Sequence, residues 1–224
     1  MKDVAIRRLD MGRRVADFTD THAASFPAGS RAAGLIDTLN TSVSNLETTG
    51  AKQEAAARAG QEATDQRDAA VAALLDQMRA INRTARGMDK LHPGLANLFR
   101  MPRSSGDQTL LNTARAFLTQ VTPIAAEFTG RGLPANFLTT FEAAINAVTT
   151  AIDAQDAALG EQTSSTAAIA AAQKQLTDAV GELSPIVRNI FSNDPATLAA
   201  WESASHVERA PKKAKKAAPL PPKP

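Results

Sequence analysis

The histidines and their acidic neighbours are the residues whose spacing comes closest to a metal site. Glu202 and His206 stand four residues apart in the sequence. Asp89 and His92 stand three apart, so each pair would share one face of a helix. A di-iron helical bundle needs Glu-x-x-His motifs on two helices and further glutamates from two others. The sequence contains no Glu-x-x-His motif, so we expect no metal site and place these histidines near helix ends.

Motifs for covalent or phosphate chemistry are also missing from the chain. No serine lies in a Gly-x-Ser-x-Gly elbow, and neither a P-loop nor a Gly-x-Gly-x-x-Gly motif occurs. The chain has no cysteine, which excludes thiol chemistry and disulfides. Acidic and basic side chains alternate between Lys52 and Arg79, a pattern typical of a solvated helix face. We therefore predict that the protein is not an enzyme and has no catalytic or cofactor-binding residue.

The lysines near the C-terminus form the densest run of charge. Residues 207–224, VERAPKKAKKAAPLPPKP, carry six basic residues against Glu208, so this segment holds +5 and residues 1–206 hold −3 of the net +2. A flexible cationic segment neutralises several phosphates, which gives weak, salt-sensitive and sequence-independent binding. The candidate contacts to nucleic acid or another anionic surface are Lys212, Lys213, Lys215 and Lys216. The same composition is typical of a solubilising extension, so both interpretations stay open.

This tail resembles two known kinds of tail. The stretch KKAKKAAP, residues 212–219, is similar to the tails of histone-like bacterial proteins and of phasins, the helical proteins that coat polyester storage granules. The resemblance covers residues 211–224. It implies association with nucleic acid in the first case and coating of a surface in the second. Residues 1–206 show no motif of either family.

An internal repeat places all of these residues in a common plan. When the chain is aligned with itself at an offset of 102 residues, without a gap, its landmarks coincide. The matched pairs are Leu9/Leu111, Arg13/Arg115, Phe26/Phe128, Gln53/Gln155, Thr64/Thr166, Leu74/Leu176, Pro93/Pro195 and Phe99/Trp201. We predict a tandem duplication with repeats at 1–104 and 105–206, followed by a disordered tail at 207–224. The competing hypothesis is a single alanine-rich helical protein with chance self-similarity.

Composition favours an all-α fold. Alanine is the most frequent residue, aromatics make up only 4%, and tyrosine is absent. Alanine, leucine, glutamate, glutamine and arginine lose little side-chain freedom in a helix, whereas strands favour aromatic and β-branched residues. No apolar run approaches the length of a transmembrane helix, and the start lacks the apolar segment of a secretory signal. We therefore expect a cytoplasmic protein.

Two heptad patterns predict two long helices. Alternating steps of four and three connect the apolar positions from Leu39 to Met88, within a helix expected at 31–87 after the N-cap Ser30. The same pattern runs from Phe141 to Ile190 in the second repeat. Both patterns lose large apolar residues midway, at Gly50, Gln53, Gly60, Thr64 and Arg67 in the first and at Gln155, Gln162 and Thr166 in the second. Small residues let backbones approach, so we expect the helices to run antiparallel and cross near Gly60 and Gln162.

Shorter helices are expected on either side of the long ones. The first repeat predicts a helix at 3–25 and a capping segment at 93–99. The second repeat predicts a helix at 107–129 with Asp107 as N-cap, divided near Pro123. Asp194 and Pro195 form an N-cap and N1 pair that starts a last helix. Gly87 is expected just beyond the end of the first long helix, and Pro134 in the first turn of the second.

Together these patterns predict an elongated antiparallel helical bundle built from two tandem short-helix/long-helix hairpins. Phe99 and Trp201 are expected to be buried aromatic plugs, one at each end. The alternative architecture breaks each long helix near Gly60 or Gly160 into a compact bundle. For function we predict a non-enzymatic scaffold or interaction protein that binds a protein partner or itself. The alternatives are weak nucleic-acid binding through the tail, or an amphipathic surface-coating role like that of phasins.

Overall fold

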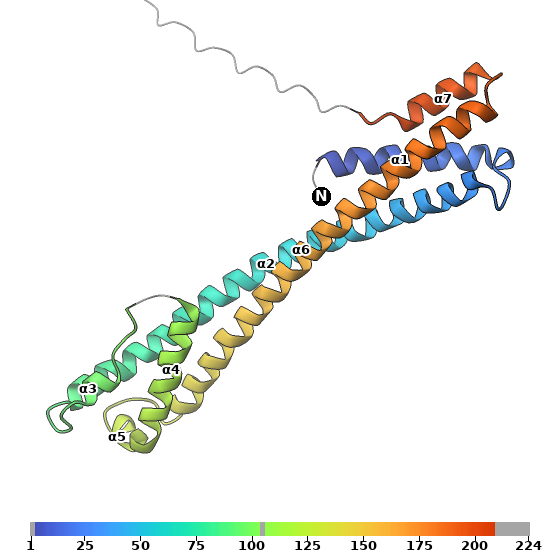
Figure 1. Cartoon of the computed structure of the whole chain (residues 1–224). Helices are drawn as coiled ribbons and strands as arrows, with labels where there is room; N and C mark the ends of the chain where they lie inside the picture. Colours follow the sequence, from blue (N-terminus) through green and yellow to red (C-terminus); the bar gives the residue numbers. More distant parts are fainter. Residues whose placement is uncertain (1–2, 104–105, 209–224) are drawn as a thin grey trace, which may run out of the picture. The chain divides into compact units, whose positions relative to one another are not determined.

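The computed structural model describes residues 3–103 and 106–208, and this part of the chain is helical with no strand (Figure 1). The elements are α1 (Asp3–Thr21), η1 (Ala23–Ser25), α2 (Arg31–Met88), α3 (Leu95–Leu98), α4 (Asp107–Val121), η2 (Thr122–Ile124), α5 (Ala125–Thr129), α6 (Phe137–Ile190) and α7 (Pro195–Ser205). The order short, long, short, long confirms the all-α fold class predicted from the sequence.

The two long helices are unbroken. α2 contains 58 residues and α6 contains 54, and each continues as α-helix through its central glycine, Gly60 or Gly160. The alternative in which the helices break at these glycines is therefore wrong. Alanine-rich sequence with few β-branched residues on both sides of each glycine sustains the helix, since one glycine costs only about 1 kcal/mol.

The described residues divide into two compact units, which do not follow the repeats. Unit 1 consists of residues 3–54 and 164–208, and unit 2 consists of 55–103 and 106–163. Under the offset of 102, residues 1–54 match 103–156, and residues 164–206 match 62–104. Each unit thus joins the beginning of one repeat to the end of the other, and the two units are equivalent to one another. The predicted boundary near residue 104 separates the two sequence repeats and not these two units. The sequence duplication itself stays a prediction.

Within each unit α2 and α6 run antiparallel. In unit 1, Gln53 Nε2 donates to Thr166 Oγ1 over 3.0 Å, and near the other end of this pair of helices Arg31 forms an ion pair with Glu182. In unit 2, Gln155 Nε2 donates to Thr64 Oγ1, also over 3.0 Å. The offset of 102 relates the first glutamine–threonine bond to the second, so this contact occurs once in each unit. These bonds confirm the predicted antiparallel direction inside each unit.

Each unit has its own apolar core, which includes a buried aromatic residue in α7 or directly after α3. In unit 1, α1 packs on α7, and Trp201 lies edge-on to Phe18 with ring centres 5.2 Å apart. In unit 2, Phe99 lies edge-on to Phe117 and Phe128, at 5.3 and 5.6 Å. Both matched aromatics are buried, as the sequence predicted.

The middle of the long helices packs differently from the predicted heptads. Leu159 is 53% exposed, and Gln162 and Thr166 are exposed as well. The buried positions there are small residues one place earlier in the heptad, Ala63 and Ser165 among them. The predicted seam is therefore wrong in this stretch. Small side chains let the two backbones approach, and a leucine at such a spacing would hold them apart.

Local signals set most of the helix starts. Ser30 Oγ accepts a hydrogen bond from the Ala33 N–H over 3.2 Å, so the predicted cap of α2 is confirmed. Asp194 Oδ1 accepts from the Thr197 N–H over 3.1 Å, and Pro195 is the first residue of α7. The proline at position 123 separates α4 from α5 by a 3₁₀ turn, as predicted, because it cannot donate a helical hydrogen bond.

Three predicted helix-end residues take other places. Asp107 is the first residue of α4 rather than its N-cap, which is Gly106, because its carboxylate binds Arg67 instead of the helix end. α6 begins at Phe137, so Pro134 lies in the preceding turn, where its carbonyl accepts from the Phe137 N–H. Gly87 lies inside α2, which ends one residue later.

Candidate functional site

The histidine and acid pairs singled out by spacing do not act together. His92 Nε2 contacts Glu127 at 2.8 Å, whereas the Asp89 carboxylate accepts hydrogen bonds from the backbone N–H groups of Gly94 and Ala96. Glu202 forms an ion pair with Arg188 at 3.6 Å and not with His206. Among the described residues, no group of three or more such side chains is placed to hold a metal ion.

The remaining histidines have structural contacts. His22 stacks on Phe18, with ring centres 4.4 Å apart, and its Nδ1 lies 2.9 Å from the Phe18 carbonyl. The backbone carbonyl of His206 accepts a hydrogen bond from Arg14 over 2.7 Å, beside the end of α7. Both residues therefore close the end of a helix.

The four tail lysines predicted to contact anions, Lys212, Lys213, Lys215 and Lys216, lie outside the described residues. None of the helices within 3–103 and 106–208 combines the length and apolarity needed to cross a membrane.

The equivalence of the two units offers another way to find a site. The matched positions serve the same fold twice, so features common to both units are explained by packing. A surface present in one unit and absent from the other is not required by the fold. Among the described residues of unit 2, three surfaces carry side chains that differ from those at the matching places in unit 1.

The first is an exposed apolar surface at the α2–α3 connection, here called the leucine patch. It surrounds a hollow of about 550 Å³ lined by Leu91, His92, Pro93, Gly94, Leu95 and Leu98. Leu91 is 71% exposed and Leu98 is 51% exposed. The matching residues in unit 1 are Asn193 and Ala200. The two leucines are therefore exposed at places where the fold accepts polar or small residues.

Hydrogen bonds to Asp89 hold the leucine patch in shape. Gly94 has a φ of 92°, a left-handed conformation that lets the chain turn sharply into α3. The Asp89 Oδ1 atom accepts from the N–H of Gly94 over 3.1 Å and from that of Ala96 over 2.9 Å. These bonds satisfy N–H groups at the start of a helix that is only one turn long.

The second surface is a polar cleft, here called the arginine cleft. It has a volume of about 440 Å³ and is lined by Asn82, Arg86, Ala96, Asn97, Arg100 and Met101. No carboxylate lines it. Within the described part of the chain, neither Arg86 nor Arg100 has a carboxylate within ion-pair distance. In unit 1 the matching residues are Arg188 and Glu202, which neutralise one another at 3.6 Å.

The third surface is an apolar cleft of about 300 Å³ beside the start of α6. It is lined by Asp76, Gln77, Ala80, Ile81, Leu133, Pro134, Phe137, Thr140 and Phe141. In unit 1, Arg31 stands at the place of Leu133, and Glu182 stands at the place of Ala80. Those two residues form an ion pair across the matching position. The place of the open apolar cleft in unit 2 is therefore occupied in unit 1 by the ion pair of Arg31 and Glu182.

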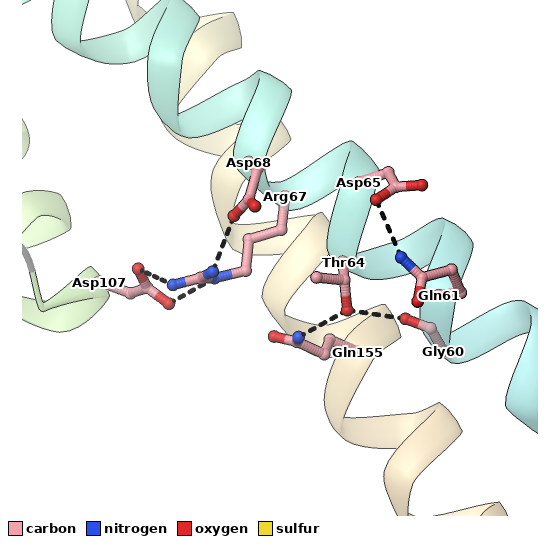
Figure 2. Close-up of polar contacts among 8 residues, drawn as sticks. All are labelled: Gly60, Gln61, Thr64, Asp65, Arg67, Asp68, Asp107 and Gln155. Atoms are coloured by element: carbon pink, nitrogen blue, oxygen red, sulfur yellow. Dashed lines mark hydrogen bonds and ion pairs between the residues drawn. The ribbon is translucent and has the colours of Figure 1, made fainter. Parts of the chain in front are cut away.

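One further difference between the units is structural. Figure 2 shows Arg67 donating two hydrogen bonds to the carboxylate of Asp107, from Nε and Nη2, each over 2.7 Å. This hydrogen bonding is the largest cause that raises the pKa of Arg67 above its ordinary value, and partial burial opposes it. The matching residues in unit 1 are Ile169 and Ala5, which belong to the apolar core. The pair thus joins α2 to the start of α4 without forming a binding site.

Sequence reasoning missed the residues that distinguish unit 2. Arg86, Leu91, Leu98 and Arg100 belong to no motif, and each looks ordinary when considered alone. The signal was present in the alignment of the repeats, because Arg100 matches Glu202. Positions where the two copies differ in charge or apolarity were as informative as the positions where they agree.

Comparison of the chain with protein-family models, with curated proteins and with solved structures finds no match.

Proposed function

We propose that the chain is a non-enzymatic helical scaffold that binds a protein partner through the leucine patch of unit 2. The observation that supports this most is that Leu91 and Leu98, both exposed, line the same hollow. Single exposed apolar residues are common, whereas adjacent ones mark interaction surfaces. Asn193 and Ala200 at the matching places indicate that the fold does not need these leucines.

Charge around the patch indicates what kind of partner fits. Residues 82–103 contain five basic residues and one acidic residue, Asp89, whereas the matching residues 184–205 contain one basic and two acidic residues. Lys90 precedes Leu91 directly, and Arg100 follows Leu98 by two residues. A second copy of the chain would bring like charges together. A protein surface with an apolar centre and an acidic rim is complementary to this patch.

Site-specific photo-crosslinking in the source cells tests the proposal. A photoreactive residue replaces Leu91 in one strain and Asn193 in a matched control strain. We expect a discrete adduct with another protein from position 91 and none from position 193. The adduct should be lost when Leu98→Ala is added, and the captured surface should be acidic.

Three results would reject the proposal. They are equal adducts from both positions, no adduct from position 91, and an adduct with a second copy of the chain alone. Circular dichroism of each variant checks that the helical fold is retained, since the replaced side chains are exposed.

A second candidate function rests on the charge of the tail. Six basic residues against one acidic residue in 207–224 favour weak, salt-dependent binding of nucleic acid. Replacing Lys212, Lys213, Lys215 and Lys216 by serine in the full chain should abolish retention of DNA at low salt. Unchanged retention would reject it. Flotation of the same proteins with lipid vesicles or polyester granules tests the surface-coating alternative.

A further inference from the structure

We propose that the arginine cleft of unit 2 binds a phosphate group. Two arginines, Arg86 and Arg100, line one cleft of about 440 Å³ together with Asn82 and Asn97. Guanidinium groups present planar arrays of N–H donors that match the oxygens of phosphate, and they stay charged at every physiological pH. The proposal is separate from the leucine patch and does not depend on it.

The charge of the cleft is not cancelled by the protein. Within the described residues, no carboxylate pairs with Arg86 or Arg100. Asp89, the one acidic residue between positions 82 and 103, accepts hydrogen bonds from the backbone N–H groups of Gly94 and Ala96. The cleft therefore has a positive potential that attracts an anion and rejects a cation.

The two arginines stand on elements that are tied together. Arg86 lies on α2, and Arg100 lies just after α3. The Asn82 side chain on α2 donates a hydrogen bond over 2.6 Å to the carbonyl of Phe99, whose ring is fully buried. This bond holds the backbone beside Arg100 against the helix that carries Arg86. An anion would then meet a site whose backbone is already ordered, which lowers the entropy cost of binding.

Unit 1 provides the internal control for this assignment. At the same two positions it carries Arg188 and Glu202, which form an ion pair at 3.6 Å. Both residues of that pair are more than half exposed. The same fold thus accepts an acid at the second position, so the arginine at position 100 is not needed to build α3 or its contacts. Replacing an acid by an arginine converts a neutral pair into a site with two positive charges.

The phosphate group can belong to a soluble compound or to a lipid headgroup, and the chemistry in the cleft is the same. The test uses the full chain with Lys212, Lys213, Lys215 and Lys216 replaced by serine, so that the tail does not contribute. Pyrophosphate is titrated by calorimetry, and vesicles of phosphatidylglycerol or phosphatidylcholine are tested by flotation. Each ligand is offered to the parent protein, to Arg100→Glu, which copies Glu202, and to Arg188→Gln as the matched control.

We expect saturable binding of one phosphate source or both, at one site per chain. Arg100→Glu should weaken it at least about tenfold, because a charge-assisted bidentate contact is replaced by repulsion. Arg188→Gln should leave it unchanged. Arg86→Lys should weaken it by a smaller factor, since lysine keeps the charge and loses the planar donors. If Arg100→Glu is poorly folded by circular dichroism, Arg100→Gln takes its place with the same expected direction.

Binding of pyrophosphate identifies a soluble source, and binding of phosphatidylglycerol vesicles alone identifies a headgroup. Either result supports the cleft when Arg100→Glu abolishes it. The proposal is overturned if neither source binds, if Arg100→Glu binds as well as the parent, or if Arg188→Gln weakens binding equally. Failure of the leucine-patch crosslink would not alter these outcomes, so the two proposals are tested separately.

Discussion

Arg67 and Asp107 stand in unit 2 at the positions that Ile169 and Ala5 hold in the apolar core of unit 1. The arginine and aspartate side chains are 26% and 24% exposed, so their ion pair is neither fully solvated nor fully buried. A pair in this situation gains from its two short hydrogen bonds and loses from partial desolvation. Its net contribution is expected to be small, although either residue alone would be costly.

We predict that Asp107→Ala lowers the free energy of unfolding by about 1–2 kcal/mol, because the partly buried Arg67 guanidinium loses two short hydrogen bonds and keeps only its ion pair with the exposed Asp68. The double substitution Arg67→Ile with Asp107→Ala, which copies unit 1, should recover the loss to within about 1 kcal/mol. Urea denaturation followed by circular dichroism measures both. A double variant that loses more stability than Asp107→Ala alone would contradict the prediction.

Asp194 gives the fold a pH-dependent contribution. Hydrogen bonds from Thr197, first from its side-chain hydroxyl and then from its backbone N–H, lower the pKa of Asp194 below its ordinary value. A carboxylate whose pKa is lower in the folded state stabilises that state above the unfolded pKa. The contribution is lost as the pH falls through the folded pKa. The relevant window therefore lies below about pH 4.

We predict that Asp194→Asn flattens the fall of stability in this window. Asparagine still caps α7 but cannot be protonated. The measurement is the thermal midpoint of parent and variant from about pH 6 down to about pH 2.5, and the difference between them isolates this group from other carboxylates. Asp20→Asn, on the exposed side of α1, is the control. A constant difference at every pH would contradict the prediction.

These two residues also show which contacts could be predicted from the sequence. The cap at Asp194 was predicted because its partner lies three residues away and proline follows it. The pairing of Arg67 with Asp107 was not, because the two residues are separated by 40 positions in the chain. A helix cap can be predicted from a short stretch of sequence, because its donor and acceptor lie within a few residues of each other. An ion pair between distant segments depends on the packing of both.

At the scale of elements, heptad periodicity predicted both long helices but not the contacts at their centres. Where leucine, valine and isoleucine recur, only one face is apolar and the pattern fixes the register. Between residues 50 and 67, alanines are so frequent that several faces are equally apolar. The helices pack through the face with the smallest side chains, such as Ala63, and the large Leu159 is exposed.

We predict effects of very different size for two substitutions in unit 2. Ala63→Leu should destabilise the protein by about 1–3 kcal/mol, because the extra volume enters a close helix–helix contact. Leu159→Gln should change stability by less than about 0.5 kcal/mol, because that side chain is mostly exposed. Denaturant midpoints of the two variants decide the matter. If Leu159→Gln were the more destabilising of the two, Leu159 would be buried, as the heptad seam predicted from the sequence requires.

For the molecule as a whole, the sequence predicted the element order and the antiparallel pairing of the two long helices. An unbroken helix cannot fold back on itself, so the two ends of α2 cannot share one core. The end of α2 packs instead with the beginning of α6 in unit 2, and the end of α6 packs with the beginning of α2 in unit 1. This pairing follows from the antiparallel direction that the heptad patterns predicted. The elongated shape stays a prediction, which small-angle X-ray scattering tests.

The candidate site belongs to this scale as well, because only comparison of the two units reveals it. Lysines in a tail are conspicuous in a sequence, whereas Arg86 and Arg100 become conspicuous only when Arg188 and Glu202 are known to pair. Where matched positions differ between the two units, packing alone does not dictate the side chain. Burial and charge partners had to be known before those differences could be interpreted.

The two cores share no residue among those described, so local damage should stay local. We predict that Trp201→Ala, which empties a large site in unit 1, increases hydrogen exchange in α1, α7 and the first part of α2. Protection in α4 should remain. Phe99→Ala should give the converse pattern, with α4 and the last part of α2 losing protection while α1 keeps it. Exchange measured by mass spectrometry resolves these segments. A uniform rise along the chain in either variant would mean that the cores unfold as one, because the continuous helices α2 and α6 would then transmit the loss from one core to the other.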